Sequence, residues 1–459
     1  MRMYFIFLLI GFLNLSNIAG QTFYVSSAGN DNNSGLSPKE AWRTLNKINE
    51  IDLKKGSYVL LEGGAVFNGN IQLDEKDGGS EKEKVIISSF GKGKATINAG
   101  SGTGIFVYNT SGISISKIRI RGDGVEKNNG SGIHFFADNN SKKLSGIEIK
   151  NCEVTGFHFY GILIQSDKDT ACGFNNVQIT DCIASENGEA GIGSLAAYPG
   201  IPHKNFRIVK CKVFNNYGIL TKTDNHSGNG IVLSGVKKFL IDSCEAYENG
   251  KDCRSNGGGP VGIWVWHCKN GGIQNSVSHH NHAGTCLHDG GGFDIDGGSS
   301  YCTISNCISY DNEGAGYLVC EFGSVLPFSN NKVINNSSRN DGLKNGYGAI
   351  TVSGAGREYP VTNTRISNNR IIVENKNTVD GVPAAIDLNN SDMRNILFEN
   401  NSFEIRNGSV VMRSDSLVTA SQVDFKNNRF LLKDSQLKVV CGKCKASDEN
   451  FWFKLLKKK

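Results

Sequence analysis

A short phrase of alternating apolar and polar residues recurs along the chain. It reads apolar, variable, apolar, polar, usually Asn or Asp, then a small residue, as in Ile147–Cys152 and Val177–Cys182. Further copies lie at Phe206–Cys211, Phe239–Cys244, Cys302–Cys307, Thr364–Asn369, Ile396–Asn401 and Val423–Asn428, with looser ones beginning at Ile273 and Val333. Nine steps separate Asn151 from Asn427, or about 31 residues per step, and a constant period of this size predicts a solenoid with one coil per repeat.

Two other phrases keep step with the first. A glycine followed by apolar-x-apolar occurs at Gly132, Gly161, Gly191, Gly230, Gly262, Gly292 and Gly316. Between the phrases stand Asn187, Asn216, Asn249, Asn281 and Asn312. Short alternating segments bounded by Asn and Gly are typical of strands joined by sharp turns. The pattern therefore predicts an all-β chain of about ten coils, whose strands stack about 4.8 Å apart.

The same register accounts for many of the cysteines. Five of them share one repeat position and are expected to form a buried ladder: Cys152, Cys182, Cys211, Cys244 and Cys307. Others lie in or beside the middle coils and are candidates for disulfides that pin loops in an exported protein: Cys253, Cys268, Cys286, Cys302 and Cys320.

Composition and charge narrow the class of protein. The chain has 459 residues with 56 Gly, 7 Pro and 20% charged residues, and its glycines have no G-X-Y period, which excludes collagen. A net charge of +5 with many β-branched and aromatic residues excludes disorder. The Lys and Arg residues are scattered, so we expect no nucleic-acid partner. A length that ordinarily suggests three domains here fits one solenoid.

The first twenty residues have the features of a secretory signal peptide. Arg2 precedes the apolar run Met3–Leu13, and the small residues Ala19 and Gly20 end the segment. The run is shorter than the ~20 residues that a membrane anchor needs. We therefore predict a signal peptide at 1–20, a secreted or periplasmic location, no membrane span after its removal, and a monomer. The remainder divides into an N-terminal cap with the first coils (21–105), a β-helix (106–435) and a C-terminal cap or tail (436–459).

Alternation along the glycine-led strands separates core from surface residues. Ile263, Val265, Phe293 and Ile295 are expected to point inward, so the residues between them point outward. Those outward residues are the pairs Trp264 and Trp266, Asp294 and Asp296, and, further along the same rows, Asp387 and Asn389. Indole faces stack on sugar rings, which suggests glycan binding. The alternative is that a long loop covers both tryptophans.

Two carboxylates on one strand face carry the predicted chemistry. Asp294 and Asp296 are two residues apart, so their α-carbons lie about 6.6 Å apart on one side of the strand. This spacing suits the acid and base of an inverting glycosidase, whose carboxyl groups lie ~6.5–9.5 Å apart. It also suits two ligands of one calcium ion. A structural alternative is hydrogen bonding to the turns at Gly290–Gly292 and Gly297–Gly298, although five flanking glycines favour an open, approachable surface.

Nearby groups extend this candidate site. His288 and Asp289 directly precede the strand, His280 lies on the turn before it, and Glu321 follows the next outward strand. A histidine can serve as general acid or base near neutral pH, and apolar neighbours can raise the pKa of Glu321. His288, His280 and Glu321 are therefore added as catalytic candidates, and Asp289, Asp387 and Asn389 as substrate-binding candidates beside the two tryptophans.

The repeats from about Gly132 to Phe430 resemble the right-handed parallel β-helix proteins of the pectate-lyase-like superfamily. The opening Thr22–Asp31, with Ser37, Pro38 and Trp42 beyond it, is similar to the N-terminal cap of secreted bacterial members. Ser37 is a good helix N-cap with Pro38 at the first helical position, so the cap is expected to contain a short helix. The resemblance implies the fold and a set of reactions on polysaccharides, namely hydrolysis, lysis and uronate epimerisation, rather than one chemistry.

The leading hypothesis is an exported enzyme that hydrolyses glycosidic bonds of a polysaccharide with Asp294 and Asp296. Lyases of the superfamily use a Lys or Arg base, often with calcium, and the outward strand positions from His134 to Asn389 carry neither residue. A lyase or epimerase stays an alternative, because a histidine or one of the loop residues Lys269, Lys344 and Arg357 could serve as the base. A second alternative is a surface protein that binds glycans without catalysis.

Overall fold

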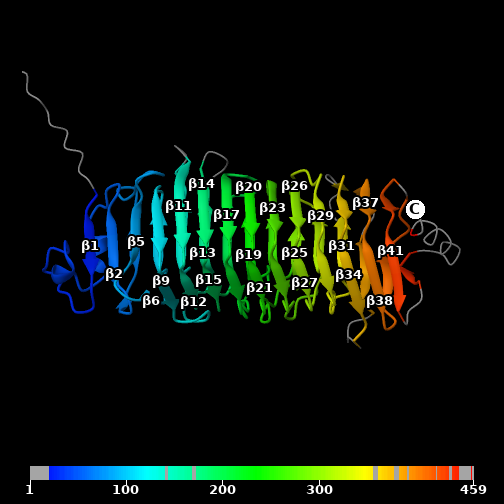
Figure 1. Ribbon diagram of the computed structural model, residues 1–459, viewed down its shortest axis with the longest axis horizontal. Coiled ribbons are helices and arrows are strands. Elements are labelled where there is room, and N and C mark those ends of the chain that lie inside the picture. The colour runs from blue at the N-terminus through cyan, green and yellow to red at the C-terminus, as the bar shows by residue number, and fades with distance from the viewer. Residues whose placement is uncertain are drawn as a thin grey trace, which may run out of the picture.

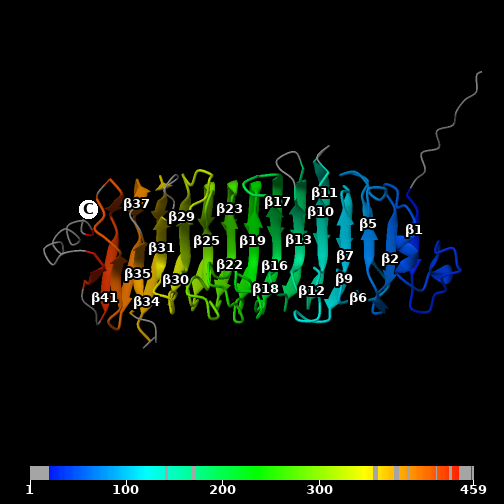
Figure 2. The same ribbon diagram turned by 180° about the vertical axis from the view of Figure 1, so that it is seen from behind.

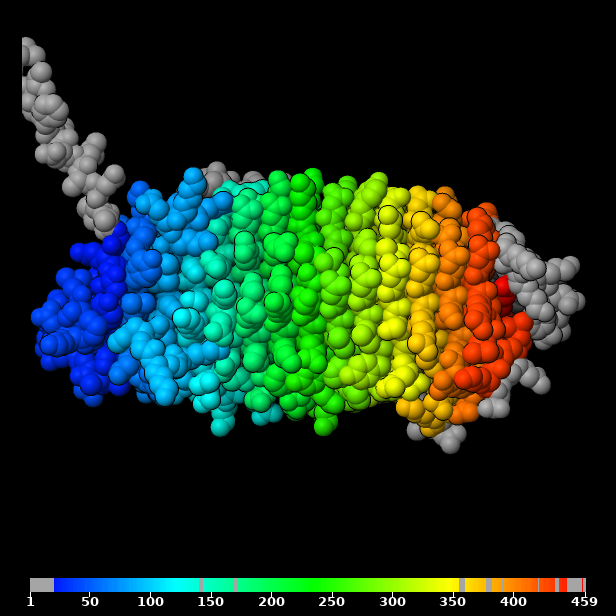
Figure 3. Space-filling model, viewed as in Figure 1, coloured from blue at the N-terminus to red at the C-terminus, as the bar shows by residue number. Residues whose placement is uncertain are grey.

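The chain forms an elongated stack of β-coils. The computed structural model describes residues 20–139, 143–167, 172–354, 360–376, 382–389, 392–419, 421–433, 437–443 and 456. Three long parallel sheets run along it from the N-terminal end to the C-terminal end (Figure 1; Figure 2 from behind). Coils follow one another in sequence order, as the colour bands of the space-filling view show (Figure 3).

Each coil contributes one strand to each sheet. Sheet A consists of β1 (Thr22–Val25), β2 (Tyr58–Glu62), β5 (Val85–Phe90), β8 (Ile113–Ser116), β11 (Leu144–Lys150), β14 (Phe174–Thr180), β17 (His203–Val209), β20 (Val236–Asp242), β23 (Lys269–Gln274), β26 (Ser300–Ser305), β29 (Lys332–Ile334), β33 (Arg365–Ser367), β37 (Ile396–Glu399) and β40 (Val423–Lys426). Sheet B consists of β3 (Val66–Asn68), β6 (Ala95–Gly100), β9 (Ile118–Gly122), β12 (Glu153–Thr155), β15 (Ile183–Ser185), β18 (Lys212–Phe214), β21 (Glu245–Tyr247), β24 (Val277–His279), β27 (Ile308–Tyr310), β30 (Ser337–Arg339), β34 (Arg370–Glu374), β38 (Ser402–Arg406) and β41 (Arg429–Lys433).

Sheet C carries the glycine-led strands. It consists of β4 (Ile71–Leu73), β7 (Ile105–Tyr108), β10 (Ile133–Ala137), β13 (Tyr160–Ser166), β16 (Ala190–Ala196), β19 (Asn229–Ser234), β22 (Val261–Trp266), β25 (Gly291–Ile295), β28 (Tyr317–Glu321), β31 (Gly348–Gly354), β35 (Ala384–Asn389), β39 (Val410–Ser414) and β42 (Val439–Cys441). A short pair, β32 (Val361–Thr362) with β36 (Met393–Arg394), completes the strands of the described residues.

The predicted all-β parallel solenoid is confirmed, but ten coils is too few. The described residues place 14, 13 and 13 strands in sheets A, B and C. The additional coils come mainly from residues before Gly132, where β2 to β9 stack in the same way without the recurrent phrases. Backbone pairing between coils needs only apolar residues facing inward and turns at the right spacing, so these coils form without the phrases.

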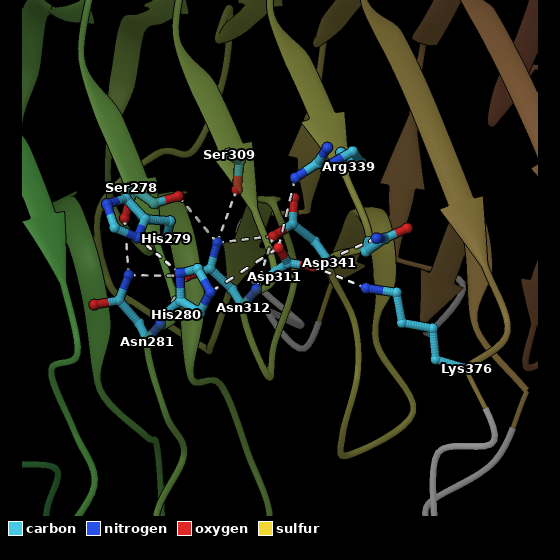
Figure 4. Close-up of polar contacts among 11 residues, drawn as sticks. Ser278, His279, His280, Asn281, Ser309, Asp311, Asn312, Arg339, Asp341 and Lys376 are labelled. Carbon is cyan, nitrogen blue, oxygen red and sulfur yellow. Dashed lines mark hydrogen bonds and ion pairs between the residues drawn. The ribbon is translucent and has the colours of Figure 1, made fainter.

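Ladders of small polar side chains run through the turns of the stack. The five predicted ladder cysteines are buried and free. At the same position further along, Asn336 accepts the backbone N–H of Cys307 through its Oδ1, at 2.9 Å. A second ladder joins Asn187, Asn216, Asn249, Asn281 and Asn312 and ends at Asp341; each Oδ1 accepts from the previous amide (Figure 4 shows its last three members). These bonds satisfy polar groups that the turns bury.

The N-terminal segment contains the expected short helix. Ser37 caps a 3-10 helix at Pro38–Glu40 and accepts the N–H of Glu40, and α1 follows at Asn46–Asn49. The predicted signal peptide lies outside the described residues except for Gly20, and most of 436–459 does as well. Within the described part of the chain, no helix is long and apolar enough to cross a membrane.

Candidate active site

The outward rows on sheet C follow the predicted register. Trp264 pairs with Asp294, which pairs with Leu318, and the row continues through Thr351 to Asp387. Tryptophan and carboxylate therefore occupy neighbouring coils at one row position. The outward apolar residues of β13 to β22 form a cluster that is separate from the core of the solenoid. Trp264 belongs to this outer cluster, and Trp266 packs against it.

These rows form the floor of a pocket of about 510 Å³. The floor is made by strands β22, β25, β28 and β31. One wall comes from the loops before β19, β22, β25 and β31, and the other from the loops after β16 and β28. The lining residues are Tyr198, Asn225, His226, Gly258, Gly259, Val261, Trp264, Trp266, His288, Asp289, Asp294, Asp296, Leu318, Cys320, Phe322, Tyr347 and Ser353. The size and mixed lining are typical of small-molecule sites.

The loops bury part of the face that the sequence predicted to be open. Asp294 is 2% exposed and Trp264 is 4% exposed, while Asp296 and Trp266 are only partly buried. The strand alternation was therefore right and the openness was wrong. Alternation is a property of the strand alone, whereas depth depends on loops from other coils.

The two tryptophans have different surroundings. The indole N–H of Trp264 donates to Asn229 Oδ1 at 3.0 Å, and the ring of His226 packs edge-on against it, 5.1 Å between centroids. Burial lowers the pKa of His226 to about 4, so this ring is neutral at neutral pH. Trp264 is thus held in place by a bond and by packing. Trp266 is the tryptophan with a partly accessible face.

Aromatic residues that the sequence did not indicate surround Trp266. Tyr198 is 54% exposed and Phe322 is 46% exposed, and both line the pocket. Buried His267 lies among the three, with its ring centroid 4.8 Å from that of Tyr198 and 4.6 Å from that of Trp266. Tyr198 and Phe322 come from loops, where strand alternation gives no information.

Carboxyl groups of the next coil lie beside the two tryptophans in the pocket. Asp294 Oδ1 is buried and has no hydrogen-bond partner among the described residues. Burial, then the neighbouring charges of Asp296 and Asp289, raise the pKa of Asp294 well above its ordinary value. Burial also raises the pKa of Asp296, although the backbone N–H of Gly297 donates to its Oδ1 and favours its ionised form. This site therefore holds at least one carboxyl proton in conditions where ordinary aspartates have lost theirs.

Asp289 fastens the loops of the first wall to one another. Its Oδ2 accepts the N–H of Gly259 at 2.8 Å, and its Oδ1 accepts the hydroxyl of Tyr347 at 3.0 Å. In the same wall, the free thiols of Cys253 and Cys286 are 2.7 Å apart, so these two are the pair of predicted loop cysteines that come into contact. His288 lies beside Asp289, exposed at the rim of the pocket.

Three other candidates lie away from the pocket. His280 is exposed on the turn after β24, where it contacts His279 and lies 4.0 Å from Asp311 (Figure 4). Asp387 and Asn389 occupy the predicted rows, but three coils from Asp294, roughly 14 Å along the axis. Asn389 donates to Asp387 Oδ2 at 3.1 Å, so these two residues bind each other.

Glu321 is buried near Asp296 but does not line the pocket. Its carboxylate accepts the backbone N–H groups of Gly298, Gly323 and Ser324. Burial raises the pKa of Glu321, as the sequence suggested, yet both oxygens hold turns together. The carboxylate of Glu321 therefore stabilises two turns, whereas the sequence indicated a catalytic candidate.

The calcium site that the sequence left open would need oxygen ligands beyond Asp294 and Asp296. Calcium takes six to eight oxygen ligands. Among the described residues, no three His, Cys, Asp or Glu side chains converge closely enough to hold a metal ion. Asp294 and Asp296 supply too few donors, and no part of the reaction below is assigned to calcium.

Comparisons with known proteins bear on the fold and the family. A family model described as a right handed beta helix region matches residues 79–227 and 221–371. The lacto-N-biosidase of Bifidobacterium longum subsp. longum is 41% identical over 76 residues, which are 16% of this chain and 5% of that protein. The chain thus matches only a small part of this relative.

Solved structures share the architecture. A GH136 lacto-N-biosidase from Eubacterium ramulus has a TM-score of 0.59 at 17% identity, covering 90% of this chain and 68% of that chain. The A-module of a mannuronan C-5 epimerase from Azotobacter vinelandii has a TM-score of 0.52 at 14% identity, covering 85% and 92%. At these identities the likeness shows the fold.

Proposed function

The chain belongs to the right-handed β-helix family, and from that premise we propose that it is a secreted or periplasmic enzyme that hydrolyses glycosidic bonds of a polysaccharide. One observation carries the proposal: the buried, unpaired carboxyl oxygen of Asp294 lies next to Asp296 in a pocket with an aromatic wall. The relatives named above include glycan-cleaving and glycan-epimerising enzymes, which agrees with this class of substrate.

The environments of the two carboxyl groups assign their roles. Asp294 is buried and unpaired, which favours its protonated form and suits the general acid that donates a proton to the leaving glycosidic oxygen. Asp296 is less buried and accepts an N–H from Gly297, which suits the base that takes a proton from the attacking water. The water oxygen bonds to the anomeric carbon as the C–O bond to the leaving group breaks, with inversion.

Trp266, Tyr198 and Phe322 form the sugar-stacking wall in this proposal, and His288 and Asp289 lie at the rim near the reacting bond. A lyase needs a base that removes the proton α to a uronate carboxylate. The described pocket lining contains no Lys or Arg, and its exposed titratable side chains are those of His288 and Tyr198. This composition favours hydrolysis over elimination.

Product analysis distinguishes the candidate reactions. We expect the purified protein to release new reducing ends from a susceptible polysaccharide without the ultraviolet absorbance of an unsaturated uronate. A screen of plant, algal and host polysaccharides, with and without a chelator, is the measurement. Absorbing products would establish a lyase, a changed uronate without cleavage an epimerase, and binding without any product a glycan-binding protein.

Trp266 and Trp264 offer a matched pair for testing the stacking wall. We expect Trp266→Ala to raise KM about tenfold, the loss of a stacking contact worth ~1–1.5 kcal/mol, and Trp266→Phe to recover most of it. Trp264→Phe removes the bond to Asn229 and should lower the free energy of unfolding by ~1–2 kcal/mol with a smaller change in KM. Initial rates and thermal melts measure both. An unchanged KM in Trp266→Ala would exclude it from the substrate site.

A further inference from the structure

A row of lysines stands on the outer face of sheet A. Lys204 on β17 pairs in register with Lys237 on β20, which pairs with Lys269 on β23. All three are exposed. Their α-carbons are one coil apart, about 4.8 Å, so three ammonium groups follow one another along the axis.

Like charges directly opposite one another on a sheet destabilise it. Elsewhere the chain avoids this: on sheet B, Lys212 pairs with Glu245 of the next coil at 2.8 Å. Within the part of the chain that the structure describes, no ion pair neutralises Lys204, Lys237 or Lys269. Lys269 lies over the ring of Tyr301, 5.8 Å from its centroid. A row of repelling cations without acidic partners fits a surface whose counter-charge is supplied by a ligand.

A groove of about 500 Å³ runs beside the lysine row on the same sheet. Amide and cationic side chains from successive coils line it: Asn176, Gln178, Asn205, Arg207, Lys238 and Asn270. Four of these, Asn176, Asn205, Lys238 and Asn270, have positive φ of 54 to 62°, and the pairing between neighbouring coils skips each of these positions. The skipped position repeats once per coil, so the groove lining repeats along the axis with the period of the solenoid.

The groove lining adds two more cations, Lys238 and Arg207, to the three lysines of the row. Neither forms an ion pair with any residue that the structure describes. One carboxylate lines the groove, that of Glu81, which accepts from Ser145 and Asn176. The nearby Glu148 pairs with Lys84, which also lines the groove. Between the cations, amide groups can donate to and accept from hydroxyl groups. The surface thus offers positive charge and hydroxyl-binding groups alternately along a line.

We propose that this groove, with the lysine row as its border, binds an anionic glycan, carboxylated or sulfated, extended along the solenoid axis. It is a separate site from the pocket, which lies on sheet C. The aromatic lining residues Phe206 and Phe239 are buried, so the groove offers no exposed rings for nucleic-acid bases to stack on. A lipid surface is disfavoured as well, because the lining carries no large exposed apolar residue.

Affinity electrophoresis and calorimetry on the full chain test the proposal. The probes are polygalacturonate as a carboxylated glycan, dextran sulfate as a sulfated one, and unmodified dextran as the neutral control. We expect binding to at least one anionic glycan, no binding to dextran, and weakening as salt is raised. Which of the two anionic probes binds identifies the acidic group.

The triple variant Lys204→Gln/Lys237→Gln/Lys269→Gln should bind at least tenfold more weakly, with an unchanged or higher melting temperature because repulsion is relieved. The control Lys39→Gln/Lys92→Gln/Lys127→Gln removes the same charge at exposed positions in other segments and should bind as the wild type does. Trp266→Ala, which is expected to weaken binding in the pocket, should bind these probes as well as the wild type does, which separates this site from the pocket. The proposal would be overturned if the Lys204/Lys237/Lys269 variant bound as well as the wild type, if both triple variants lost binding equally, or if the protein bound neither anionic glycan.

Discussion

Asp294→Asn is expected to reduce turnover ~10³-fold while the fold stays intact, because general acid catalysis contributes roughly 10²–10⁴-fold. Asparagine has the same shape as aspartate but cannot donate the proton that the leaving oxygen needs. The variant loses no hydrogen bond at Oδ1, because that atom has no partner among the described residues. Initial rates of reducing-end release and a thermal melt are the two measurements.

Asp387→Asn is the matched control for this experiment. Asp387 occupies the same outward row, is 1% exposed, and also has a buried Oδ1 without a partner. Burial raises the pKa of Asp387 to about 7, so the electrostatic effect of its replacement on folding resembles that at Asp294. It lies outside the pocket, so activity should persist. Full activity in Asp294→Asn, or an equal loss in Asp387→Asn, would show that the pocket carboxyl is not the catalytic acid.

The rows of outward residues could be predicted from sequence because strand alternation is local. Trp264 and Asp294 were placed next to each other from the repeat period alone, and the coil register agrees. Their burial could not be predicted, since it depends on loops whose conformations are set by contacts between coils. Tyr198 reaches the pocket from a loop between β16 and β17, and its hydroxyl accepts an N–H from Val325, 127 residues away. The repeat period of the sequence does not predict such a contact between loops.

Glu321 shows the complementary limit. The sequence placed a carboxyl group near the acidic pair, and the structure agrees about the neighbourhood. Its three backbone donors, however, come from turns at Gly298, Gly323 and Ser324. A residue type and a position on a strand therefore predict proximity. Whether the group is free for chemistry depends on the turns around it.

The asparagine ladder ends in a residue that differs by one atom from its predecessors. Asn281 and Asn312 each donate from Nδ2 to the hydroxyl of a serine three residues earlier, Ser278 and Ser309 (Figure 4). Asp341 occupies the next place, with Oδ1 accepting from Asn312 and Oδ2 2.5 Å from the hydroxyl of Ser338. Burial raises the pKa of Asp341 from 3.8 to about 7. An asparagine here would keep every bond of the ladder and carry no charge.

We therefore expect Asp341→Asn to stabilise the protein, and to do so only where Asp341 would be ionised. Because the folded pKa lies above the unfolded one, the folded state binds more protons between these values, and the wild type loses stability as pH rises through them. At about 1.4 kcal/mol per pKa unit, the loss reaches at most ~4 kcal/mol above pH 7. The melting temperature of Asp341→Asn should exceed that of the wild type at about pH 8, and the gap should narrow toward pH 4. Asn312→Asp, which puts a second carboxyl into the ladder, should show the opposite sign at the same pH. A gap that is independent of pH would mean that Asp341 is not buried as a neutral acid.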